Sequence, residues 1–103
     1  MWLFTSKSFV SIVVDLTDDS KFLVRARMPG DIEELFPDAA VKKGEGTDYL
    51  YRASILKEDV AKRVNDYVMG MDYGNFKNSV PQDQDARHDA YMEVWSVMHK
   101  YQS

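Results

Sequence analysis

Three arginine residues lie in two short apolar stretches of the sequence that have the composition of β-strands. Arg25 and Arg27 belong to residues 22–28, and Arg52 belongs to residues 49–55. Guanidinium groups bind phosphate and carboxylate groups through paired hydrogen bonds, and a rigid sheet would fix the spacing between them. The alternative is that they are ordinary solvent-facing strand residues paired with acidic side chains across strands. The acidic residues considered for such pairs are Asp15, Glu45 and Asp48.

Alternation along the two stretches predicts which face of the sheet carries these arginines. The stretches align residue by residue, so that Arg25 matches Arg52. Successive side chains of a strand point to opposite faces, so one alternate set is expected in the core. That set is Phe22, Val24, Ala26, Met28, Tyr49, Tyr51, Ala53 and Ile55. The three arginines are then expected together on the other face, which in this register offers no aromatic side chain for stacking a nucleic acid base.

A second candidate site is the group Arg87, His88 and Tyr91 near the start of the last predicted helix. Histidine suits general acid–base catalysis because it gains and loses a proton near neutral pH. An arginine and a tyrosine beside it would suit a phosphate ester as substrate. The simpler interpretation is that the first turn of a helix carries polar residues that contact a neighbouring loop.

Residues 71–80 form a third region of interest, because this loop contains aromatic residues that could tie it down. Tyr73, Phe76 and Val80 are expected to anchor this loop by packing. Asn75 and Lys77 are the residues that it would present to a partner if it does not simply pack into the core.

Apolar periodicity and turn residues predict the elements that position these groups. Strands are expected at residues 9–15, 21–28, 39–43 and 49–56, and helices at 31–36, 57–71 and from 83 or 85 to 102. Turns are expected at residues 15–20 and 44–48, and residues 72–82 are expected to be irregular. Asp31 is the expected N-cap of the first helix.

Two helices carry apolar stripes at helical spacing. The stripes are Val60, Val64, Tyr67, Val68 and Met71, and then Tyr91, Val94, Trp95, Met98 and Tyr101. The order strand, strand, helix occurs twice before the last helix. This order predicts an α+β fold of two layers: a four-stranded antiparallel sheet from two ββα units plus a C-terminal helix, in a single domain of residues 1–103. The last helix either lies across the arginine side of the sheet or leaves it open.

Composition excludes several classes of function. The 103-residue chain has 13 Lys and Arg against 17 Asp and Glu, a net charge of −4, which argues against a non-specific duplex binder and makes nucleic acid in general an unlikely partner for non-specific binding. The absence of cysteine excludes disulfides, thiolate zinc sites and cysteine nucleophiles. The two histidines lack metal-ligand spacing, so neither a metal nor a cofactor is expected. No apolar run is long enough to span a membrane and no signal-peptide pattern is present, so we expect a cytoplasmic protein without a membrane partner.

Several short segments together carry a resemblance. They are residues 2–5 with Phe9 and Ser11, residues 25–27, 48–53, 72–73 and 75–77, and Arg87, His88, Tyr91, Val94 and Trp95. The sequence resembles a group of short, single-domain bacterial or phage proteins of uncharacterised function. The resemblance covers nearly the whole chain and implies a bacterial or phage origin and a free-standing domain. It brings no catalytic or binding residues with it.

Three hypotheses for function follow from the sequence. The first is a small interaction module that binds a protein partner or forms a homodimer, since no catalytic set is evident and sheet faces and edges are natural docking surfaces. The second is an anion- or nucleotide-binding domain that uses Arg25, Arg27 and Arg52. The third is a phosphate-ester enzyme with His88 as acid or base and with Arg87 and Tyr91 as stabilising groups.

Overall fold

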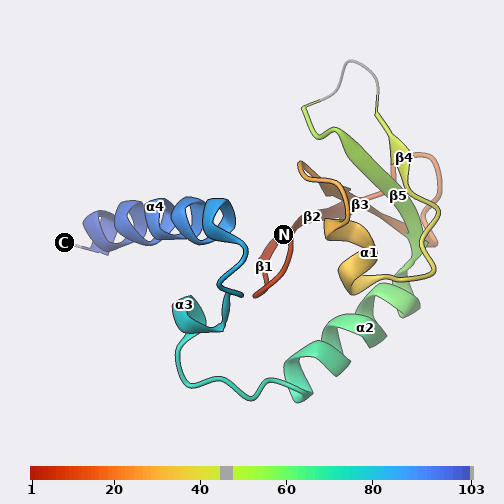
Figure 1. The fold of residues 1–103 in the computed structure, drawn as a ribbon. Coiled ribbons are helices and arrows are strands. Elements are labelled where there is room, and N and C mark those ends of the chain that lie inside the picture. The colour runs from red at the N-terminus through yellow and green to blue at the C-terminus, as the bar shows by residue number, and fades with distance from the viewer. Residues whose placement is uncertain (45–47, 103) are drawn as a thin grey trace. The chain divides into compact units, whose positions relative to one another are not determined.

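The computed structural model describes residues 1–44 and 48–102, which fold as two compact units, Met1–Met71 and the segment from Asp72 onward. The first unit is an antiparallel sheet with two helices, so the chain has an α+β fold (Figure 1). Its strands, in spatial order, are β1 (Trp2–Phe4), β2 (Phe9–Val14), β3 (Lys21–Ala26), β5 (Tyr51–Leu56) and β4 (Lys42–Lys43). Its helices are α1 (Asp31–Leu35) and α2 (Lys57–Met69).

The sheet has five strands among the described residues, not the four that we predicted. The additional strand is β1, where Leu3 pairs with Val10 and Phe4 pairs with Phe9. The strand expected at residues 39–43 is reduced to β4, which has two residues. The strand expected from Tyr49 begins at Tyr51. The predicted turn at residues 44–48 includes residues 45–47, which lie outside the described part of the chain.

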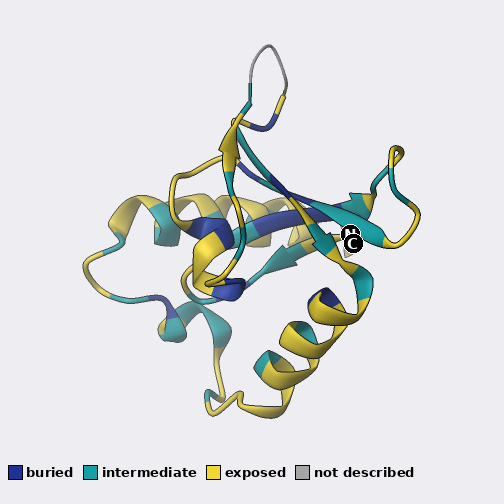
Figure 2. Ribbon diagram, turned by 90° about the vertical axis from the view of Figure 1, so that its right-hand side faces the viewer, coloured by how far each residue is buried: buried dark blue, intermediate teal, exposed yellow. Residues whose placement is uncertain are grey.

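The core lies between one face of the sheet and the two helices. Val10, Val24 and Ala26 on the central strands are fully buried, as is Ile32 of α1, and Val60 of α2 joins the same cluster. Figure 2 shows the buried residues on the central strands and α1, whereas most of α2 is exposed. Alternation therefore holds as predicted for Phe22, Val24 and Ala26 of β3 and for Tyr51, Ala53 and Ile55 of β5.

Some residues that we predicted to lie in the core, at the ends of β3 and α2, are exposed. Met28 lies beyond the end of β3 and is exposed, because the chain turns away at Pro29 and Gly30. On α2, Val64 and Tyr67 pack against the core, but Val68 is half exposed. Met71 lies after the helix and is also half exposed.

Asp31 was predicted to be the N-cap of α1, and this prediction is wrong. The N-cap is Gly30, whose φ of 88° lies in the left-handed region that favours glycine. Asp31 is instead the first helical residue, and its buried Oδ2 accepts a hydrogen bond of 2.9 Å from the backbone N–H of Phe9. This bond joins the start of α1 to the start of β2.

The second unit contains α3 (Phe76–Ser79) and α4 (Asp85–Gln102). The short helix α3 lies within the segment that we predicted to be irregular. It begins at an Asn75 cap, whose side chain accepts a hydrogen bond of 3.2 Å from Asn78 N–H. The apolar stripe predicted on α4 does not form part of a core, because α4 contains no buried residue.

Replacing a core side chain tests the packing of α1 on the sheet. Ile32→Ala should lower the free energy of unfolding by about 2–5 kcal/mol, because it leaves a cavity between α1 and the central strands. Glu33→Ala, an exposed change in the same helix, should alter it by no more than about 0.5 kcal/mol. Urea unfolding followed by circular dichroism measures both, and equal effects of the two changes would contradict this packing.

Candidate functional site

The sheet register places Arg25 and Arg52 directly opposite each other. Arg25 on β3 pairs with Arg52 on β5, and Arg52 in turn pairs with Lys42 on β4. Directly paired residues of antiparallel strands point to the same face, with Cβ atoms about 4.5–5.5 Å apart. These three residues, here called the cationic row, carry three positive charges across three strands. We call the side of the sheet that bears them the arginine face.

Arg25 is held in place by two neighbours. Its Nη2 donates a hydrogen bond of 2.9 Å to Oγ of Ser11, the residue that pairs with it on β2. Its guanidinium carbon lies 4.5 Å from the centre of the Tyr49 ring, a cation–π contact. Tyr49 is only 4% exposed, so its ring supports the arginine and is not a free stacking surface.

Tyr49 is a correction to the predicted alternation. We expected its side chain on the core face with Tyr51, yet its ring contacts arginines of the other face. The physical reason is that β5 begins at Tyr51, so Tyr49 lies in a bend where the strand's period of two does not apply.

Arg27 lies just beyond the end of β3 and is bound differently from Arg25. Its guanidinium carbon is 4.2 Å from the Tyr49 ring centre, and its Nη1 is 3.3 Å from Oδ1 of Asp48. The hydrogen bond to Asp48 raises the pKa of Arg27 above its ordinary value. Arg27 is therefore paired with an acidic residue, which is the alternative that we considered from the sequence. Glu45, another acidic residue named there, lies outside the described residues.

Two nitrogens of the cationic row lack partners. The Nε atoms of Arg25 and Arg52 are buried, and within residues 1–44 and 48–102 neither has a hydrogen-bond acceptor. A buried unsatisfied donor costs about 1–3 kcal/mol, and an arginine cannot relieve that cost by losing its proton. Like charges directly opposite each other across a strand pair add to the cost.

A cleft of about 620 Å³ lies along the cationic row. Arg25, Arg52 and Lys42 line it together with apolar side chains. The apolar residues include Val13, Leu16 and Leu23, and Ser54 and Asp15 supply the polar remainder. The lining of the cleft thus includes both cationic and apolar side chains.

Asp15 contributes a negative charge at the same cleft. Its Oδ2 accepts a hydrogen bond from Oγ of Ser54, and its Oδ1 accepts bonds of 2.9 and 2.7 Å from Thr17 N–H and Oγ1. These bonds, the one from Ser54 foremost, lower the pKa of Asp15 from 3.8 to about 2. Asp15 is therefore ionised near neutral pH, and its carboxylate accepts hydrogen bonds from the hydroxyl groups of Ser54 and Thr17.

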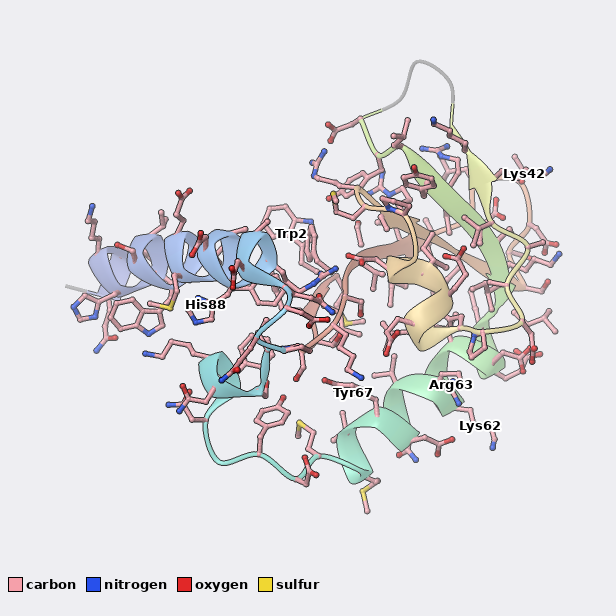
Figure 3. The ribbon with its side chains drawn as sticks, viewed as in Figure 1. Trp2, Lys42, Lys62, Arg63, Tyr67 and His88 are labelled. Carbon is pink, nitrogen blue, oxygen red and sulfur yellow. The ribbon has the colours of Figure 1, made fainter. Side chains whose placement is uncertain are left out.

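The sequence did not identify two residues on the arginine face. Lys42 belongs to a strand of two residues, too short to show an alternating pattern. Trp2 pairs with Ser11, which places it on the arginine face, and it is 68% exposed. Figure 3 shows Trp2 and Lys42, which belong to the two edge strands of the sheet.

The other predicted site residues lie in the second unit and are engaged there. Asn75 caps α3, and Lys77 Nζ lies 4.9 Å from the centre of the Trp95 ring. Arg87 donates to Oε1 of Gln84 at 2.6 Å and to the Tyr91 hydroxyl at 3.1 Å.

His88, labelled in Figure 3, lies on α4 with its Nδ1 3.9 Å from Oδ1 of the exposed Asp89. It lines a cleft together with Lys77, Asn78 and Asp85. Its role in catalysis stays a prediction.

Within residues 1–44 and 48–102, no three histidine, aspartate or glutamate side chains form a group that could hold a metal ion. None of the helices found there has the length and apolar character needed to cross a bilayer. Comparison with known protein families, curated proteins and solved structures finds no match for this chain.

The hydrogen bond from Ser54 to Asp15 predicts a pH effect. Because the pKa of Asp15 is lower in the folded chain, its ionised form stabilises the fold above about pH 4, and this stabilisation is lost as the pH falls from 3.8 towards 2. Ser54→Ala should raise the pKa of Asp15 towards 3.8, as measured by NMR titration of the carboxyl group. Ser20→Ala, which removes a bond to Asp18, should leave the pKa of Asp15 unchanged. An unchanged pKa in Ser54→Ala would show that this bond is absent in solution.

Proposed function

We propose that the arginine face binds an anionic ligand of the phosphate or carboxylate class, with Arg25, Arg52 and Lys42 as its cationic contacts. The observation that carries this proposal is the direct opposition of Arg25 and Arg52 over a cleft that both residues line. Like charges in that position destabilise a sheet unless an anion lies between them. A bound phosphate or carboxylate would accept hydrogen bonds from both guanidinium groups and neutralise the row.

The surroundings of the row favour a specific site over general charge attraction. Arg25 is fixed by Ser11 and Tyr49, so a ligand would not have to order its side chain on binding. The apolar lining residues Val13 and Leu23 would lower the effective dielectric constant beside the arginines and strengthen charge interactions. Asp15 repels an anion, which favours a bound position towards Lys42.

Inorganic pyrophosphate is a suitable first probe. It should bind the wild-type chain and raise its melting temperature relative to sodium chloride of equal ionic strength. Arg52→Gln should weaken binding by about tenfold or more, as measured by titration calorimetry. Lys62→Gln, which removes an exposed charge on α2, should leave it unchanged. Asp15→Asn should tighten pyrophosphate binding, because it removes a negative charge from the cleft.

Two results of this experiment would contradict the anion site. One is that pyrophosphate fails to bind the wild-type chain at all. The other is that Arg52→Gln and Lys62→Gln weaken binding equally, because binding would then follow net charge. A circular dichroism spectrum of each variant shows that it remains folded, which we expect because Arg52 makes no hydrogen bond through its Nε that the substitution would break.

A second candidate function, self-association, is favoured by the exposed apolar residues of α4. Val94, Val97, Met98 and Tyr101 follow helical spacing and are 40%, 63%, 55% and 81% exposed. Glu93 and Lys100, seven residues apart, border this stripe on the same side. If two copies paired their α4 helices in antiparallel orientation, Glu93 of one copy would lie opposite Lys100 of the other. This charge complementarity points to a second copy of the chain as the occupant.

Charge reversal tests this pairing. Glu93→Lys should weaken the dimer by placing two cations opposite each other, and Lys100→Glu should weaken it by the same effect between anions. The double variant Glu93→Lys/Lys100→Glu should restore it. Sedimentation velocity measures the monomer–dimer equilibrium, and a wild-type chain that stays monomeric at all concentrations would exclude this function.

A further inference from the structure

Trp2 lies in the same row of paired residues as the cationic row. It pairs with Ser11 on β2, Ser11 pairs with Arg25 on β3, and Arg25 pairs with Arg52. Neighbouring strands are about 4.8 Å apart, so Trp2 and Arg25 are separated by about 10 Å across the face. An exposed aromatic side chain and an opposed pair of guanidinium groups therefore share one surface. This corrects our expectation that the arginine face has no aromatic group available for stacking.

Two phenylalanines support the position of Trp2. The rings of Trp2 and Phe9 meet edge to face, with centroids 6.0 Å apart. Phe9 stacks on Phe4 with centroids 4.5 Å apart. Such contacts restrict the indole, yet Trp2 remains 68% exposed. The indole is thus both held and accessible, as a stacking surface requires.

A single strand of nucleic acid offers the two groups that this surface can bind. Its bases stack on aromatic side chains, and its phosphates accept hydrogen bonds from arginine. A duplex keeps its bases stacked inside, so Trp2 would have no base face to contact. The net charge of −4 also opposes binding of a duplex over a broad surface. The cationic row is a local positive region on a chain that is negative overall.

We infer that the anionic ligand of the arginine face is a single-stranded nucleic acid, with a base stacked on Trp2 and backbone phosphates bound by Arg25 and Arg52. This inference rests on the anion site proposed above. Phe9 and Phe4 act as positioning residues for the indole. Recognition in this arrangement depends on the phosphate backbone and one base, so it tolerates many sequences.

Fluorescence anisotropy with a labelled oligoadenylate strand tests the inference. A matched strand with the same phosphates and no bases separates stacking from charge. The wild-type chain should bind the complete strand about 5- to 150-fold more tightly than the abasic one. Trp2→Ala should remove this difference and leave the binding of pyrophosphate unchanged. Trp2→Phe should restore part of it, and Trp95→Ala, the matched change on α4, should have no effect.

Arg52→Gln probes the phosphate contacts of the same complex. It should weaken the complete strand and the abasic strand alike. It should also reduce the slope of log affinity against log salt concentration by about 0.7, the value expected for one phosphate contact on a single strand. RNA and DNA versions of the strand show whether the ribose hydroxyl adds affinity.

The outcomes separate this inference from the anion site on which it rests. If pyrophosphate binds but complete and abasic strands bind equally, the anion site stands and the nucleic acid is excluded. If polyglutamate competes with the strand and its binding also depends on Trp2, the ligand is an acidic peptide and the inference is wrong. If neither pyrophosphate nor any strand binds, both proposals fail.

Discussion

The pairing of β3 with β5 is the constraint on which both faces of the sheet depend. Val24 pairs with Ala53 in the core, and the next pair along the strands is Arg25 with Arg52 on the other face. A slip of one residue along either strand would turn its arginine into the core, at a cost of several kcal/mol for an unpaired buried charge. Core packing and the position of the cationic row are therefore set by the same register.

That register carries an electrostatic cost that the chain only partly offsets. Ser11 and the Tyr49 ring stabilise Arg25, and Asp48 neutralises Arg27. The buried Nε atoms of Arg25 and Arg52 still have no acceptor within the described residues. An uncompensated pair of like charges is consistent with the proposed anion site, because a bound anion would supply the missing negative charge. A protein selected for stability alone would be expected to carry a neutral residue on at least one of the two strands.

The sequence predicted those parts of the site that depend on a regular period. Alternation along the expected strands at residues 21–28 and 49–56 predicted that Arg25 and Arg52 share a face, and the alignment of the two stretches made them equivalent positions. The sequence did not predict that these two strands are neighbours, which the pairing of β3 with β5 shows. It missed Trp2 and Lys42, because strands of three and two residues have no readable period and form only by pairing with longer neighbours. It misplaced Tyr49, which lies just outside β5. The spacing of residues along the chain also does not predict that Trp2 lies in the same row as Arg25. Their alignment follows from the strand order β1-β2-β3.

The two short edge strands have a consequence for how this sheet meets other molecules. An exposed edge recruits foreign strands when it offers a long row of unpaired backbone groups, the usual route to aggregation and to peptide capture by strand addition. Here one edge, β4, consists of two lysines, and the other, β1, has three residues. Charged and very short edges give an incoming strand little to extend. In the proposed function, binding therefore depends on the side chains of the sheet's face and not on its backbone edges.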